Sequence, residues 1–262
     1  DDKNYPVEVA GVPPDYFSAD GQLWGNPCYD WKAMKRDRYR WWIRRIAGSA
    51  KLYDVLRIDH FRGFDTYWSV PAGETTAKNG TWKKGPGMNL VGLLSKKFPN
   101  IQFIAEDLGE PSPTVVKLLQ DSKWPGMKVL EFAFDSGEPN DYQPHSYNKN
   151  CVCYTGTHDN ATAMEWYMDA KTQDKSYACQ YMGISADEMF NWGMIRSGME
   201  SVANLFVAQM QDYLGLGKGH RINVPGTPTG NWQWRLLNDD IDKGLAKKIK
   251  DMTILYGRTS KK

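Results

Sequence analysis

The sequence has few cysteines, and no two of them stand in a C-x-x-C spacing. The four occupy positions 28, 151, 153 and 179. Cys151 and Cys153 lie two apart in an apolar run, so their side chains share one face of an expected strand. A chain of 262 residues can bury a sizeable core without disulfides. We therefore predict buried, reduced thiols, with no disulfide framework and no metal site, and a reducing, cytoplasmic location.

Long apolar runs and an excess of charge are also missing. No stretch approaches the roughly 20 apolar residues that a membrane span needs, and no segment reads as a signal peptide. The formal net charge is +2, with basic and acidic residues interspersed. The most basic segment, Lys35 to Arg40, is typical of a solvated helix face. We therefore expect neither nucleic acid nor a membrane as a partner.

Aromatic residues, by contrast, are abundant. The chain holds 11 Trp and 14 Tyr, and many of them stand beside Gly, Pro, Asn or Asp, which favour loops. Such rings pack cores and anchor loops, but their flat faces also match the apolar faces of sugar rings. Rings in loops are available for binding. The composition leaves core packing and sugar stacking both open.

Short apolar runs that end on polar residues recur along the chain, as buried parallel strands do. These runs cover residues 52–58, 101–105, 129–134, 151–154 and 205–210. Helices are expected at residues 31–47, 114–119, 161–168, 185–196 and 239–256. The expected end signals are Gly48 after the first helix, Ser112 and Asn160 as N-caps of the second and third, and a capping box over Ser185–Glu188. The Gly- and Pro-rich residues 9–17 predict an ordered loop.

This alternation of strands and helices predicts an α/β fold. Polar residues at the C-terminal ends of strands are typical of a (β/α)8 TIM-type barrel. About five strands are found, whereas a closed barrel needs eight. The chain also lacks an initial methionine and starts abruptly. We therefore expect a barrel that lacks its N-terminal strands in this chain, as in a fragment of a longer protein.

Three acidic residues follow three of the expected strands: Asp59, Glu106 and Asp159. Strand ends converge at one mouth of a barrel, so these side chains are expected to meet there. Two convergent carboxyl groups suit the retaining cleavage of a glycosidic bond, in which one is an ionised nucleophile and the other a protonated acid. The environments of the two must then push their pKa values apart.

The neighbouring residues indicate how the two carboxyl groups differ. Arg57 has the strand parity of Asp59, so its guanidinium can favour the ionised form of that carboxyl. The apolar residues 103–105 lead into Glu106 and can raise its pKa by desolvation. Asp159 can stabilise the positive charge of an oxocarbenium-like transition state, and His158 can bind a sugar hydroxyl.

Two other interpretations use the same residues. The acids together with His60 and His158 can supply a one- or two-metal hydrolase site, although the sequence holds only four histidines and no H-x-H or H-E-x-x-H pair. The loop aromatics can instead form a carbohydrate-binding module without catalysis. Three acids at a barrel mouth would be unusual for such a module.

Several motifs resemble those of one known family. Arg57-Ile58-Asp59-His60-Phe61-Arg62-Gly63 resembles the fourth-strand motif of the amylomaltases, the 4-α-glucanotransferases of glycoside hydrolase family 77 in the α-amylase superfamily. The segments 11–18 and 21–27 resemble that family's mobile loop over the acceptor sites. Further matching segments are 70–77, 105–109, 155–160, 211–217 and 231–235, so the resemblance runs from about Glu8 to the C-terminus.

The resemblance implies a role for each matching residue. Asp59 would be the nucleophile, Glu106 the general acid/base and Asp159 the stabiliser of the transition state. Substrate binding would fall to Arg57, His158, Tyr16, Gln22, Trp24 and Asn223. No metal and no cofactor would be needed. Residues 1–262 would form the C-terminal part of a single barrel catalytic domain, because the family's N-terminal part has no counterpart here.

The resemblance also implies the reaction: segments of α-1,4-glucan pass between maltooligosaccharides or starch chains by double displacement. The aromatic loop around residues 16–24 would keep water from the intermediate. A hydrolase of the same glucans, or a catalytically incomplete carbohydrate-binding fragment, stays open. The absent half of the barrel would be the further partner, since an open barrel exposes strand edges.

Overall fold

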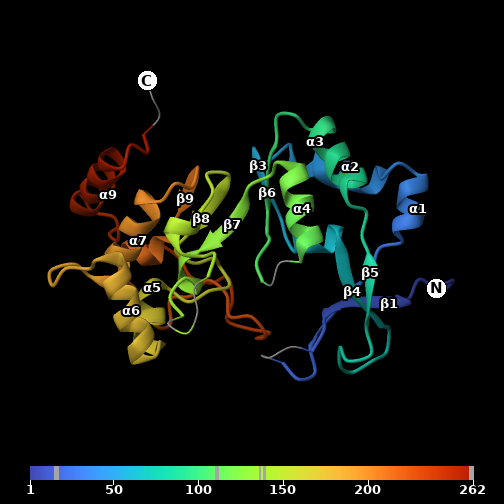
Figure 1. Ribbon diagram of the computed structural model, residues 1–262, viewed down its shortest axis with the longest axis horizontal. Helices are drawn as coiled ribbons and strands as arrows, with labels where there is room; N and C mark the ends of the chain where they lie inside the picture. The colour runs from blue at the N-terminus through green and yellow to red at the C-terminus, as the bar shows by residue number, and fades with distance from the viewer. Residues whose placement is uncertain (15–17, 110–111, 136, 138–139, 260–262) are drawn as a thin grey trace. The chain divides into compact units, whose positions relative to one another are not determined.

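The computed structural model describes residues 1–14, 18–109, 112–135, 137 and 140–259, in which helices and strands combine into a mixed α/β fold (Figure 1). The chain separates into two compact units. Unit 1 spans Asp1–Gly126 and unit 2 spans Met127–Lys262. Among the described strands we find three sheets and no closed barrel, so the predicted barrel is seen only in its strand–helix alternation.

A four-stranded antiparallel sheet in unit 1 was not predicted from the sequence. Its strand order is β2-β1-β4-β5, with bounds β1 Glu8–Val12, β2 Gln22–Pro27, β4 Thr66–Pro71 and β5 Thr81–Lys84. The loop predicted at residues 9–17 is therefore wrong for its first part, because Val9 pairs with Val70 and both are buried. The Gly-rich sequence serves close packing: a Cβ at Gly11 would lie 2.5 Å from the Gln22 carbonyl oxygen.

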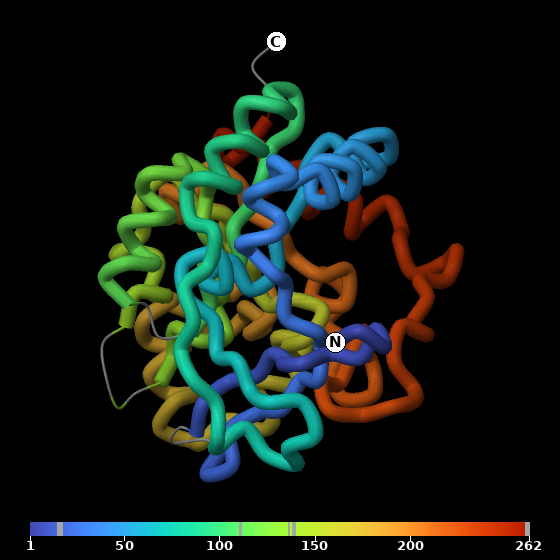
Figure 2. Tube along the Cα trace, turned by 90° about the vertical axis from the view of Figure 1, so that its right-hand side faces the viewer, coloured from blue at the N-terminus to red at the C-terminus, as the bar shows by residue number. Residues whose placement is uncertain are grey.

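The second sheet of unit 1 is a parallel pair, β3 (Val55–Ile58) and β6 (Gln102–Ala105). The predicted strands 52–58 and 101–105 are thus confirmed, with later starts. Four α-helices accompany the two sheets of unit 1: α1 Trp31–Arg36, α2 Arg40–Ser49, α3 Met88–Lys97 and α4 Pro113–Ser122. Ser112 caps α4 as predicted, since its hydroxyl accepts from the Val115 N–H. Figures 1 and 2 show the antiparallel sheet at one end of unit 1 and helices α2 and α3 at the other.

The single helix predicted for residues 31–47 is wrong, because the chain breaks it between α1 and α2. Arg38 and Tyr39 have φ values of 59° and 56°, in the left-handed region that ends a helix. The break turns the Tyr39 side chain into the core beside Trp42 and Ile46, where it is 5% exposed. Periodicity alone cannot show this, since apolar residues occur on both sides of the break.

Unit 2 is organised around a three-stranded sheet, β7-β8-β9, in which β8 and β9 are parallel. The strands are β7 Gly126–Val129, β8 Cys151–Tyr154 and β9 Leu205–Val207. The helices are α5 Ala163–Asp169, α6 Thr172–Met182, α7 Phe190–Glu200, α8 Met210–Tyr213 and α9 Lys243–Leu255. Single turns of 3₁₀ helix stand at Phe61–Phe64 in unit 1 and at Leu130–Phe132 and Pro144–Ser146 in unit 2.

Helix α7 is the central helix of unit 2. Nine of its eleven residues are buried, and it packs against α5, α6, α8 and α9. Cys151 and Cys153 of β8 are buried nearby, as the sequence predicted. Burial raises the pKa of the Cys153 thiol to about 12, which keeps it protonated at neutral pH.

Two helix starts in unit 2 differ from the predictions. Thr162, not Asn160, caps α5, while the Asn160 Oδ1 atom accepts from the N–H and the hydroxyl of Thr157. The predicted capping box over Ser185–Glu188 is also wrong, because α7 begins at Phe190 and Glu188 pairs instead with an arginine of that helix. In both cases another partner binds the polar side chain: Thr157, three residues earlier, for Asn160, and Arg196 of α7 for Glu188.

The segment after α9 is tied to the end of α7 by a single arginine. The Arg258 guanidinium donates to four backbone oxygens, those of Gly198, Met199, Ser201 and Ala203, at 2.7–3.4 Å.

Arg258→Ala leaves these oxygens without a cationic donor, so we expect the free energy of unfolding of unit 2 to fall by about 2–3 kcal/mol. Urea unfolding measures this. Lys250→Ala, at an exposed position of α9, is the matched control and should change it by less than about 0.5 kcal/mol. Equal effects of the two variants would contradict the assignment.

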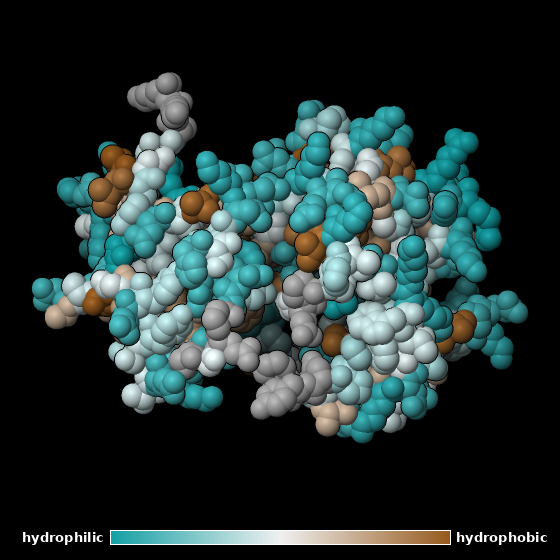
Figure 3. Space-filling view, viewed as in Figure 1, coloured by the Kyte–Doolittle hydropathy of each residue, from teal (hydrophilic) through white to brown (hydrophobic). Residues whose placement is uncertain are grey.

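No described helix is long and apolar enough to cross a membrane. On the face drawn in Figure 3, hydrophilic residues predominate and apolar residues form small, separate groups.

Candidate active site

Two of the predicted acids follow the paired ends of neighbouring parallel strands in unit 1. Ile58 of β3 lies opposite Ala105 of β6, so Asp59 and Glu106 come next at the same edge of this sheet. The backbone continues the pairing, since Glu106 N–H donates to the Ile58 oxygen and Phe61 N–H to the Glu106 oxygen, both at 2.9 Å. This is the placement that the sequence predicted for these two residues.

Asp59 lies in an open, charged environment. Its Oδ1 atom is 2.9 Å from Nη2 of Arg57, two residues earlier on the same strand. The Asp59 side chain is 84% exposed and that of Arg57 is 26% exposed. An exposed carboxylate beside a guanidinium is open to approach by a substrate, which a nucleophile requires.

Glu106 lies in a different environment. Its Oε2 atom accepts from the backbone N–H of His60 at 2.6 Å, and its Oε1 atom from that of Leu108 at 3.0 Å. Burial raises the pKa of Glu106, helped by the negative charge of Asp59, and outweighs the opposing effects of the two N–H groups and of Arg57. The sequence predicted this direction from the apolar residues before Glu106. His60 directs its N–H to the carboxylate from a left-handed backbone conformation, with φ of 47°.

A pocket of about 270 Å³ opens beside Asp59. Its aromatic lining comprises Trp24, Tyr29, Trp31, Trp42, His60, Phe64 and Tyr67. The Trp24 ring meets the His60 ring edge-on at 4.8 Å, and the Trp24 Nε1–H donates to the Gln22 side chain at 3.2 Å. Trp24 and Gln22, which were predicted as substrate-binding residues, are therefore hydrogen-bonded to each other beside this pocket. Tyr16, predicted with them, lies outside the described residues.

Asp159, the third predicted acid, has its own set of partners in unit 2. The Asn223 side-chain amide donates to its Oδ1 atom at 2.5 Å, and the His158 Nε2 atom lies 3.2 Å from its Oδ2 atom. Asn223 also donates its backbone N–H to the His158 oxygen at 3.1 Å. Three residues that the sequence predicted separately thus form one hydrogen-bonded group. That all three acids gather at one rim stays a prediction.

The sequence reasoning missed two residues next to this group. Arg221 donates from Nη2 to the backbone oxygen of Asp159 at 2.8 Å. The Trp232 ring lies 5.1 Å from the His158 ring, and Trp232 is 57% exposed with φ of 62°. An exposed aromatic ring in a left-handed conformation is unusual. The available signal was the loop sequence Gly230-Asn231-Trp232, which favours such a conformation.

Buried carboxyl groups of unit 2 were also missed. Glu131 is 8% exposed and Asp212 is fully buried. Burial raises the pKa of Glu131 well above its ordinary value and also raises that of Asp212. Glu131 stands in the apolar run of residues 129–134. An ionisable residue inside such a run was the signal for it.

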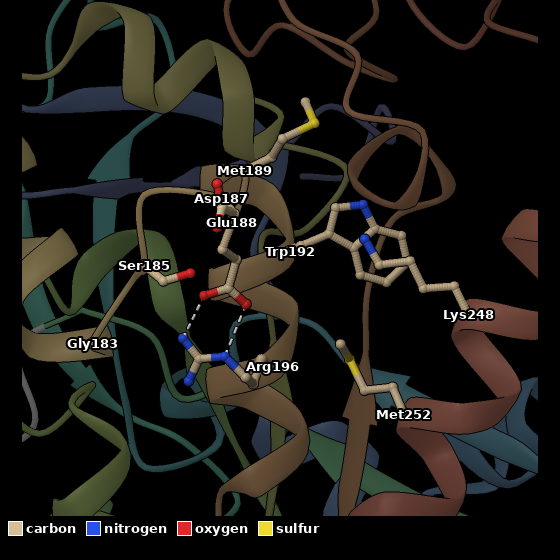
Figure 4. A pocket seen from close by; sticks show the side chains of 9 residues that line it. All are labelled: Gly183, Ser185, Asp187, Glu188, Met189, Trp192, Arg196, Lys248 and Met252. Atoms are coloured by element: carbon tan, nitrogen blue, oxygen red, sulfur yellow. Dashed lines mark hydrogen bonds and ion pairs between the residues drawn. The ribbon is translucent and has the colours of Figure 1, made fainter.

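Another pocket of unit 2, of about 520 Å³, lies between helices α7 and α9 and the segment 183–189 (Figure 4). Its Glu188 and Arg196 side chains form a two-point ion pair, with Nε–Oε1 and Nη2–Oε2 distances of 2.9 and 2.7 Å. The Lys248 ammonium lies 3.7 Å from the centre of the Trp192 ring. Glu188, Arg196 and Lys248 therefore have partners within the pocket. We interpret these contacts as stabilising the packing of α7 and α9.

The metal interpretation depends on a cluster of ligands. In the part of the chain that the structure describes, no group of three or more His, Cys, Asp or Glu side chains is arranged to hold a metal ion.

Comparison with known proteins places the chain in a family. Residues 2–240 match the 4-alpha-glucanotransferase family. The chain belongs to this family. It is 48% identical over 254 residues to the 4-alpha-glucanotransferase of Clostridium butyricum, covering 97% of this chain and 52% of that protein. It is 44% identical over 259 residues to the chloroplastic/amyloplastic 4-alpha-glucanotransferase of Arabidopsis thaliana, covering 98% of this chain and 45% of that protein.

Solved structures give a consistent result. The amylomaltase from Streptococcus agalactiae in complex with acarbose matches with a TM-score of 0.93 and 38% identity, over 98% of this chain and 52% of that one. The amylomaltase from Corynebacterium glutamicum, at 19% identity and a TM-score of 0.72, shows the likeness of fold alone. The chain spans about half the length of the curated relatives it matches.

Proposed function

We propose that this chain carries the catalytic acids of a 4-α-glucanotransferase that moves α-1,4-glucan segments between maltooligosaccharides or starch chains. One observation supports this most directly. Asp59 and Glu106 follow paired residues of two parallel strands, yet one carboxyl is solvated beside a guanidinium and the other is partly buried with a raised pKa. Retaining transfer needs this division between an ionised nucleophile and a protonated acid.

In the proposed reaction, Asp59 attacks the anomeric carbon of the donor glucan while Glu106 protonates the departing glycosidic oxygen. The bond from the anomeric carbon to that oxygen breaks as the bond to the Asp59 oxygen forms. The 4-hydroxyl of an acceptor glucan then displaces Asp59, and Glu106, now ionised, takes the hydroxyl proton. Each proton leaves and returns through one carboxyl group, so no cofactor is needed.

The remaining predicted residues receive supporting roles in this proposal. Asp159 stabilises the positive charge of the transition state, with its carboxylate oriented by His158 and Asn223. Arg57 holds Asp59 ionised. Gln22 and Trp24 of β2, together with Tyr16, contact the acceptor and keep water from the intermediate. The solved amylomaltase with bound acarbose supports an α-glucan as the substrate class.

The partner proposed for this chain is the part of its relatives' length that it does not match. Among the described strands, β3 and β9 each have a strand partner on one side only. Apolar side chains are exposed along them, with Val55 at 42%, Leu205 at 46% and Val207 at 40%. Further parallel strands that pair with these edges would bury this surface and complete the (β/α)8 barrel as one domain.

A cytoplasmic location stays a prediction. The chloroplastic/amyloplastic name of the Arabidopsis relative shows that the family is also found in plastids.

Incubation with maltotriose tests the proposed function. The chain is assayed alone and after coexpression with the half of the Clostridium butyricum relative that it does not match. We expect the complemented protein to release glucose together with maltooligosaccharides longer than maltotriose, because transfer lengthens one chain as it shortens another. Chromatography of the products measures both.

Three results would contradict this proposal. Glucose and maltose without longer products would indicate a hydrolase. Activity lost on adding a chelator would indicate a metal site. Maltotriose binding without turnover, unchanged in Asp59→Asn and Glu106→Gln, would indicate a binding module.

A further inference from the structure

The segment that carries His158 and Asp159 rests on a buried glutamate. Glu131 follows β7 in a single turn of 3₁₀ helix, and its backbone N–H donates to the Thr155 oxygen at 3.2 Å, where this segment leaves β8. The Glu131 side chain is buried and its Oε1 atom has no hydrogen-bond partner. A buried carboxyl oxygen without a partner is costly, so such a group calls for an explanation beyond stability.

The Glu131 carboxyl group packs against the backbone at Gly156. A Cβ atom at Gly156 would lie 2.5 Å from the Glu131 Oε1 atom and 3.1 Å from the Asn160 Cβ and Gln209 Nε2 atoms. The backbone at Gly156 therefore lies directly on the carboxyl group, and only glycine fits there. The position of this carboxyl sets how closely the segment 156–161 can approach the sheet.

The rest of the segment is held from the same side. The Gln209 side-chain amide donates to the Thr157 and Ala161 oxygens at 3.1 and 3.3 Å. Arg221 donates to the Asp159 oxygen at 2.8 Å. The segment thus has fixed points before, within and after the His158–Asp159 pair, and the first of them is Glu131.

Charged groups face Glu131 from three elements. They are Asp212 of α8, Glu165 of α5 and Arg221 of the following loop. Burial and the two acids raise the pKa of Glu131, while Arg221 and the Ala161 N–H lower it by less. These surroundings favour the neutral form of the side chain, which can lie against a backbone segment without repelling its carbonyl oxygens.

We propose that Glu131 is a positioning residue that holds the segment Gly156–Ala161, and with it His158 and Asp159, in the geometry needed for glucan transfer. It touches neither substrate nor the reacting atoms and acts through the backbone it supports. The link to transfer rests on the proposed function, whereas the support of the segment is a property of unit 2 itself.

Nuclear magnetic resonance of the histidine side chains tests the positioning without any activity. The chain has four histidines, at positions 60, 145, 158 and 220, and His158→Gln assigns the signal of interest. We expect Glu131→Ala to shift or broaden the His158 signal and to leave those of His60 and His145 in place. Glu131→Gln has the same shape and is neutral, so its spectrum should match that of the unaltered protein.

Two further variants separate positioning from folding. Gly156→Ala keeps Glu131 but pushes against its carboxyl, so it should disturb the His158 signal as Glu131→Ala does. Glu165→Gln changes a neighbouring, partly buried acid on α5 and is the matched control, with no expected change at His158. A spectrum in which all four histidine signals move would mean general loss of structure and would overturn the proposal, as would an unshifted His158 in both Glu131→Ala and Gly156→Ala.

Kinetics of the complemented enzyme then test the link to transfer. We expect Glu131→Ala to lower kcat about 100-fold, because small misplacements of a catalytic group have effects of this size. The KM for maltotriose should change less than about threefold, and Glu131→Gln should restore kcat. A disturbed His158 with unchanged kcat would overturn the role in transfer. If the unaltered enzyme shows no transfer at all, the proposed function fails, and the spectra still decide whether Glu131 supports the segment.

Discussion

Asp59→Asn is expected to lower the rate of glucan transfer by at least about 10⁴-fold, because the amide cannot attack the anomeric carbon and no covalent intermediate forms. The loss should lie in kcat, since Arg57 and the aromatic pocket beside Asp59 remain to bind the glucan. Disproportionation of maltotriose by the complemented protein measures it.

The control for this variant is Asp54→Asn, which removes an exposed carboxyl just before β3. It alters the charge of unit 1 by the same amount and should leave transfer within about twofold of the unaltered rate. Asp59→Asn with more than a tenth of the normal kcat would show that the nucleophile lies elsewhere.

Glu106→Gln has the second large expected effect, a fall of about 10²- to 10⁴-fold in transfer. The unaltered enzyme needs Glu106 protonated for the first step, so its rate should fall as the pH rises through the raised pKa of this carboxyl. An amide does not titrate, and the variant should therefore lack this alkaline decline. Initial rates measured across the pH range test both expectations.

A donor substrate whose leaving group needs no proton separates the acid step of Glu106 from its base step. With a maltosyl fluoride, Glu106→Gln should still complete the first displacement but resolve the intermediate slowly, because the base is missing. A glycosyl group should then accumulate on Asp59 and appear as an added mass in the intact protein. Glu74→Gln, at a partly exposed acid of unit 1, should accumulate none. Glu106→Gln without this adduct, yet with normal transfer from maltotriose, would contradict the acid/base assignment.

The local features that the sequence predicted correctly depend on short-range chemistry. The parallel strands before Asp59 and Glu106 were visible as apolar runs that end on acids, and Ser112 before Pro113 marked the start of α4. The raised pKa of Glu106 followed from its apolar approach. In each case the residues that decide the outcome are neighbours in the sequence.

Two of the failures share a different cause. The single helix over residues 31–47 breaks because Tyr39 reaches a core made by distant residues such as Phe61 and Leu90. The predicted loop at residues 9–17 begins as strand β1 because β4, some sixty residues later, supplies its partner. Asn160 loses its predicted capping role to Thr162, while its own side chain folds back on Thr157. In the first two cases local patterns cannot show the distant residues that decide the outcome, whereas the partner of Asn160 lies only three residues away.

The sequence by itself determined the family, the mixed α/β character and the identity of the candidate acids, because these follow from motifs and from the periodicity of apolar residues. Only the tertiary structure decided how those acids differ. Asp59 is solvated beside Arg57, Glu106 is partly buried and accepts from two backbone N–H groups, and Asp159 is held by Asn223 and Arg221 from a loop some sixty residues away. The reason is physical: the charge state and orientation of a carboxyl depend on its surroundings in space, and folding assembles those from remote parts of the chain.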